Sequence, residues 1–157
     1  MNSGGERDLV QIGALELRFL VDETQSSGNL VMFETTVPPN ARVPAPHYHR
    51  DVYEVIYGLE GILTFTLAGE KHEIGPGESL LVPRGSVHGF ENPHAATARV
   101  LSVLTPGSIG RRYFEAVAAA VNVPGNPTSS VSRRSCSRTA WYRPEAPRFG
   151  GATSREG

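Results

Sequence analysis

The sequence has little of the chemistry that marks secreted or membrane-spanning proteins. A single cysteine, Cys136, among 157 residues cannot form an internal disulfide. No apolar run approaches the ~18 residues that a membrane-spanning helix requires, and the first residues lack the basic and apolar regions of a signal peptide. We therefore expect a cytoplasmic protein with no membrane partner.

Net charge is also nearly absent, because 15 Lys and Arg side chains oppose 16 Asp and Glu side chains. The average hides an uneven chain. Residues 1–123 carry 9 basic and 14 acidic side chains, whereas residues 124–157 carry 6 and 2. The acidic part disfavours nucleic acid as a partner, since proteins that bind nucleic acid are usually basic. The breakers at residues 124–127 predict that residues 123–157 form an irregular tail.

The tail permits a second interpretation. When codons permitted for residues 134–143 are shifted by one base, they encode a segment with helical apolar spacing. Residues 124–157 are then an extension translated out of frame relative to its ancestor. The 14 arginines against one lysine agree with the GC-rich gene that this interpretation requires.

Short apolar or alternating runs, separated by breaks rich in Gly and Pro, predict an all-β sandwich or barrel. The runs span residues 15–21, 30–37, 52–57, 62–67, 79–82, 87–90 and 98–104. One helix is predicted after Ser108, which is a possible N-cap. Ile109, Tyr113, Val117 and Val121 recur there at four-residue spacing, and this stripe predicts a helix packed on the outside of the sheet.

All five histidines lie between positions 47 and 94, so we expect the functional site in this part of the chain. His47 and His49 share a face if they lie on a strand, whereas Glu54 reaches that face only if the chain bends near residues 50–51. His88 offers a third imidazole on a later run. Neutral imidazoles with one carboxylate suit a divalent first-row metal. A His-x-His pair alone is equally consistent with solvated or hydrogen-bonded histidines.

The remaining two histidines have no such spacing. His72 lies beside a turn, where we expect a solvated hairpin edge, and His94 follows a proline in a loop that we expect to be exposed.

The spacing of these residues resembles the two motifs of the cupin family. The first motif, His-x-His, four residues, Glu, six residues, Gly, is matched by His47, His49, Glu54 and Gly61, apart from the glycine that usually opens it. The second motif is matched throughout by Gly77, Pro83, Gly85, His88 and Asn92. The fifteen residues between Gly61 and Gly77 resemble the short spacer of small single-domain cupins.

The resemblance implies a double-stranded β-helix, which is a small antiparallel β-barrel or jelly roll, with one C-terminal helix. It covers residues 15–122, so residues 1–14 are predicted to be an N-terminal extension. It also implies a homodimer and one metal ion held by His47, His49, Glu54 and His88. Four protein ligands leave open positions only in five- or six-coordination, which favours Fe, Mn, Ni or Co, with Zn as a further candidate.

Similarity to quercetin-dioxygenase-like cupins implies a metal-dependent dioxygenase acting on a small aromatic or enolic substrate. Glu54 is then the catalytic general base as well as a ligand. Ile56, Phe65 and Phe90 are expected to line the substrate pocket, since strand parity places Ile56 and Phe90 on the interior face.

Two other functions stay open. A cupin that binds a small ligand without turnover, for example as a sensor, is the main alternative. A sugar-phosphate isomerase on the same barrel needs basic residues to bind phosphate, and the candidates near the barrel mouth are Arg42, Arg50 and Arg84.

Overall fold

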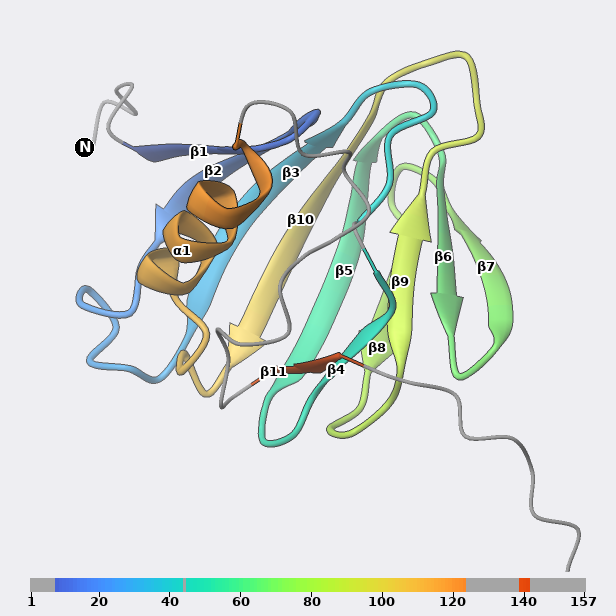
Figure 1. Ribbon diagram of the computed structural model, residues 1–157. Helices are drawn as coiled ribbons and strands as arrows, with labels where there is room; N and C mark the ends of the chain where they lie inside the picture. Colours follow the sequence, from blue (N-terminus) through green and yellow to red (C-terminus); the bar gives the residue numbers. More distant parts are fainter. Residues whose placement is uncertain (1–7, 44, 124–138, 142–157) are drawn as a thin grey trace, which may run out of the picture.

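The computed structural model is a sandwich of two antiparallel sheets with one helix (Figure 1). It describes residues 8–43 and 45–123, together with the backbone of residues 139–141. The helix is α1 (Arg111–Val121). The strands are β1 (Leu9–Ile12), β2 (Leu15–Val21), β3 (Val31–Val37), β4 (His47–His49), β5 (Tyr53–Glu60), β6 (Leu63–Leu67), β7 (Glu70–Ile74), β8 (Ser79–Val82), β9 (His88–Glu91), β10 (Ala98–Thr105) and β11 (Thr139–Trp141). The predicted all-β class with a C-terminal helix is confirmed.

One sheet has the strand order β1-β2-β3-β10-β5-β8, and the other has the order β11-β4-β9-β6-β7. In β3 and β10, every second side chain is buried and the others are half-buried or exposed. Since successive side chains of a strand point to opposite faces, one face of this sheet packs against the second sheet and α1. The core therefore lies between the two layers.

Two strands fall in segments that the sequence predicts to lie outside the domain. β1 lies within residues 1–14 and pairs antiparallel with β2, but its four residues are too few to show a period. β11 lies within residues 123–157 and pairs with β4. Residues 124–138 and 142–157 lie outside the described part of the chain. The out-of-frame interpretation concerns these residues and stays a prediction.

The sequence predicts that the helix packs on the outside of the sheet, and this prediction is wrong. It lies over β1, β2 and β3 in Figure 1, and Tyr113, Phe114 and Val117 line the interior cavity. The ring of Phe114 lies 5.0 Å from that of Phe33 and 5.7 Å from that of Phe19, measured between centroids. Periodicity correctly identifies the apolar stripe, but it cannot tell which face of a sheet the stripe covers. The helix thus closes one side of the sandwich.

The predicted cap of this helix is also corrected. The N-cap is Gly110 rather than Ser108, and glycine has no side chain that could cap the helix. The carboxylate of Glu23 accepts the main-chain N–H of Arg111 at 2.9 Å instead. A negative group at this position is favourable because the first N–H groups of a helix have no partner within the helix. A residue 88 positions away thus performs the capping, which local sequence cannot reveal.

The far end of α1 is tied to the start of the chain. Asn122 donates to the carbonyl of Gln11 at 2.7 Å and accepts the N–H of Gly13 at 2.8 Å. The amide side chain of Asn122 therefore links the end of α1 to the turn between β1 and β2.

The motif glycines and Asn92 occupy demanding turns. Gly61, Gly77 and Gly85 have φ angles of 65°, 86° and 74°, so the positive φ predicted for them is confirmed. A Cβ on Gly61 would also lie 2.3 Å from the carbonyl oxygen of Thr97. Asn92 is fully buried and orders the turn after β9, as predicted. Its Nδ2 donates to two main-chain carbonyls at 2.8 Å each, and its Oδ1 accepts a main-chain N–H at 3.0 Å.

Candidate metal centre

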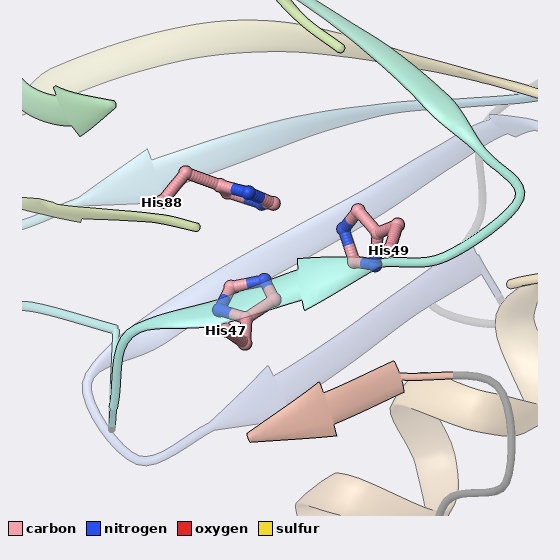
Figure 2. A group of neighbouring side chains, drawn as sticks. All are labelled: His47, His49 and His88. Carbon is pink, nitrogen blue, oxygen red and sulfur yellow. The ribbon is translucent and has the colours of Figure 1, made fainter. Parts of the chain in front are cut away.

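Strands β4 and β9 bring three histidines together. His47 and His49 come from β4, and His88 begins β9 directly opposite His47. Figure 2 shows the three imidazoles turned toward a common space. Their ring centroids lie 4.4 Å apart for His47 and His88, 4.9 Å for His49 and His88, and 5.1 Å for His47 and His49. Each histidine offers a ring nitrogen, and these nitrogens lie within 4.8 Å of one another.

Glu54 reaches the same place from the other sheet. The chain leaves β4 after His49, bends at residues 50 and 51, and enters β5 at Tyr53. This bend is the one that the odd spacing predicts. Oε2 of Glu54 lies 3.3 Å from Nε2 of His49 and 3.4 Å from Nε2 of His88. The carboxylate therefore contacts two of the three histidines.

The donor set is suited to a metal ion. Nδ1 of His88 donates to the carbonyl of Ser86 at 2.9 Å, which leaves Nε2 of the same ring as the acceptor facing the cluster. Nδ1 of His47 lies 3.2 Å from the carbonyl of Ala45 in a similar arrangement. Nε2 of His88 is buried and has no hydrogen-bond partner among the described residues. The three histidines could thus bind a metal ion, with carbonyls fixing the tautomer of two rings.

Burial and mutual contact shift the pKa values of the cluster. Burial lowers the pKa of His47 to about 3, with the neighbouring histidines acting in the same direction. Burial acts to raise the pKa of Glu54, but contacts with His49 and His88 outweigh it and hold that pKa well below its usual range. Burial lowers the pKa of His88, whereas its contact with Glu54 acts against burial and leaves the pKa raised. Glu54 is therefore ionised at neutral pH.

These shifts predict that metal affinity depends on pH. A metal ion binds neutral imidazole, so it must displace the proton that Glu54 stabilises on His88. His47 stays neutral above its pKa of about 3 and releases no proton. Since one proton is displaced, we expect the Kd for Co²⁺ to rise by up to about tenfold for each pH unit below the raised pKa of His88. Competition with a chromophoric chelator between pH 5.5 and 8.5 measures this slope, and a constant Kd across that range would contradict it.

The cluster opens into a small apolar cavity of about 90 Å³. Ile56, Phe65 and Phe90, which the sequence proposes as pocket residues, all line it. The ring of Phe65 stacks on that of His88 with 5.8 Å between centroids. Sequence reasoning missed Tyr113, Phe114 and Val117 of α1, because it places the helix outside the sheet. It also missed the polar residues Thr35 and Ser102 on β3 and β10, which strand alternation could have revealed.

The other polar candidates lie away from this cavity. Arg42 lines a separate groove, Arg50 is exposed, and Arg84 stacks over the ring of Tyr53 with its Cζ 4.6 Å from the centroid. None of the three arginines lines the cavity, so the described residues there offer no cation for a phosphate group.

His72 and His94 also lie apart from the cluster. His72 is half-buried on the edge strand β7, and Nε2 of the partly exposed His94 pairs with Oε2 of Glu73 at 2.9 Å.

Comparisons with known proteins agree with this architecture. A family model described as a cupin domain matches residues 33–104. Quercetin 2,3-dioxygenase of Bacillus subtilis is 29% identical over 103 residues, which are 66% of this chain and 30% of that protein. The chain therefore spans less than a third of the length of this curated relative.

Solved structures extend the likeness to the fold. The polyketide cyclase RemF from Streptomyces resistomycificus has 31% identity and a TM-score of 0.57, with 69% of this chain and 80% of that chain covered. An RmlC-like cupin from Shewanella frigidimarina has 23% identity and a TM-score of 0.58, with 71% and 93% covered. In the part of the chain that the structure describes, no helix is sufficiently long and apolar to cross a membrane.

Proposed function

Since the chain belongs to the cupin family, we propose that it is a metal-dependent dioxygenase acting on a small aromatic or enolic substrate. In this proposal His47, His49, Glu54 and His88 hold one divalent ion of Fe, Mn, Ni or Co, with Zn as a further candidate. The observation that carries it is an ionised carboxylate buried beside three convergent imidazoles at the end of an apolar cavity.

Each part of the site has a role in this proposal. A bound ion supplies Lewis acidity that acidifies a substrate hydroxyl, together with the redox chemistry that dioxygen requires. Glu54 accepts the hydroxyl proton, because its low pKa keeps it ionised and its Oε2 lies at the histidine cluster. The aromatic rings of Phe65 and Phe90 hold the apolar part of the substrate and exclude water.

The experiment measures metal content and oxygen uptake on the full chain. After reconstitution with each metal, oxygen consumption is followed with flavonols and with small diketones. We expect one ion per chain and uptake with at least one substrate. In the variant Glu54→Gln we expect uptake to fall about 10²–10⁴-fold, which is the usual contribution of a general base. Glu73→Gln, which alters an exposed carboxylate outside the cavity, is the matched control.

The outcomes separate the functions that the sequence leaves open. One bound ion with no oxygen uptake for any substrate would favour a ligand-binding or sensor cupin over a dioxygenase. No stoichiometric metal after reconstitution would contradict the metal site itself.

A further inference from the structure

The cavity wall formed by β2, β3, β10 and β5 is apolar except at three positions. Glu54 on β5 belongs to the histidine cluster. Ser102 on β10 and Thr35 on β3 are the other two, with 3% and 4% of their surfaces exposed. Both therefore place a hydroxyl against an otherwise apolar surface.

These hydroxyls line the cavity without a hydrogen bond to the described residues. They are not among the fully buried side-chain atoms that lack a partner, which are Nδ1 of His49 and Nε2 of His88. Each hydroxyl is therefore accessible from the cavity rather than sealed in the core. A polar group that enters the cavity can bond to whichever hydroxyl lies within its reach.

Strand register places Ser102 next to the cluster and Thr35 beyond it. Glu54 pairs with Leu104, and Ser102 lies two residues earlier on β10, opposite Ile56. Strand geometry then gives a Cα separation of about 8 Å between Glu54 and Ser102. Thr35 lies on the next strand, opposite Val100, which is two residues before Ser102. The same geometry gives a Cα separation of about 16 Å between Thr35 and Glu54. A short ligand that touches the cluster can therefore reach Ser102 but not Thr35.

The cavity volume sets the size of that ligand. At about 90 Å³ it is smaller than the cavity of about 150 Å³ that holds one benzene molecule. A flavonoid, with three rings, is much larger. The space suits a short aliphatic molecule, whose apolar carbons face residues such as Ile56 and Phe90.

We propose that Ser102 determines specificity by hydrogen-bonding the second oxygen function of a short aliphatic ligand whose first oxygen lies at the metal beside Glu54. The ligand class is a hydroxy- or oxo-carbonyl compound that can enolise. This inference rests on the proposed function and narrows its substrate from aromatic or enolic compounds to short enolic ones.

Ligand binding to the Co²⁺-loaded protein tests the proposal without turnover. The probes are 3-hydroxypropionate and propionate, which share a carboxylate and differ by one hydroxyl, and binding is followed by calorimetry and by the Co²⁺ absorption spectrum. We expect the wild type to prefer 3-hydroxypropionate roughly fivefold, the usual size for one hydrogen bond. Ser102→Ala is expected to remove this preference and leave propionate binding unchanged. Thr35→Val, which removes the hydroxyl beyond reach, is expected to keep it.

The outcomes distinguish this inference from the proposed function. If the wild type binds Co²⁺ and Ser102→Ala keeps the preference, only the inference fails. If Ser102→Ala instead unfolds more readily with the preference intact, the hydroxyl serves the fold and the inference is wrong. Tighter binding of quercetin than of 3-hydroxypropionate would contradict the size argument. If the wild type binds no Co²⁺, the proposed function fails and the inference fails with it.

Discussion

Replacement of His88 by glutamine is expected to abolish stoichiometric metal binding and to raise the Kd for Co²⁺ more than 100-fold. His88 is 2% exposed, and its Nε2 is the acceptor atom that faces the cluster. Glutamine keeps a polar side chain of similar size, so it leaves no large cavity, but an amide is a much poorer ligand than imidazole for a first-row divalent ion. Loss of even an outer partner of a metal ligand costs 10–100-fold in affinity, so loss of a ligand should cost more.

The chain contains two matched controls for this variant. His72→Gln and His94→Gln alter histidines outside the cluster, and both are expected to keep one Co²⁺ per chain. Metal content is measured by elemental analysis after dialysis, and circular dichroism checks that each variant is folded. Stoichiometric metal in folded His88→Gln would show that this residue does not hold the ion.

Replacement of Asn92 by alanine is expected to lower the free energy of unfolding by about 3 kcal/mol. The side chain makes three hydrogen bonds, to the carbonyls of Val37 and Ala96 and from the N–H of His94. Alanine leaves three main-chain groups unpaired, in one buried and two part-buried hydrogen bonds, which costs about 1–3 kcal/mol for each group that finds no water. The melting temperature is expected to fall by roughly 6–12 °C for a chain of this length.

Chemical denaturation with urea measures the change, and Asn29→Ala is the control. Asn29 is exposed, and its Nδ2 makes a local bond to the carbonyl of Ser26. Its loss should change stability by less than about 0.5 kcal/mol. Equal effects in the two variants would show that Asn92 does not order the turn after β9.

The sequence predicts much of the fold because turns and strands leave local signals. The runs at residues 15–21 and 79–82 coincide with β2 and β8, and the other predicted runs differ from the observed strands by a few residues at their ends. The positive φ angles of Gly61 and Gly85 also follow from their places in turns. Features formed between distant segments leave no such signal. The capping of Arg111 by Glu23 and the inner position of α1 both depend on packing across the whole chain.

The candidate site can also be predicted from the sequence only in part. The spacing of His47, His49 and His88 predicts three imidazoles that converge, and the structure brings them together. The roles of these residues as ligands, the catalytic role of Glu54, the homodimer and the cytoplasmic location stay predictions. The sequence does not identify Ser102 as a pocket residue, because serine is common on exposed strand faces. Its burial in the cavity wall is seen only in the structure.

The link between the two ends of the domain bears on how the protein folds during synthesis. Asn122 joins Gly13 and Gln11 across 109 and 111 residues of sequence. Contacts at such separation make folding slow, because a long loop must close before they form. While the ribosome still covers α1, the hydrogen bonds from Asn122 to Gln11 and Gly13 cannot form. A nascent chain that ends before α1 therefore leaves open the part of the cavity that Tyr113, Phe114 and Val117 close in the folded protein.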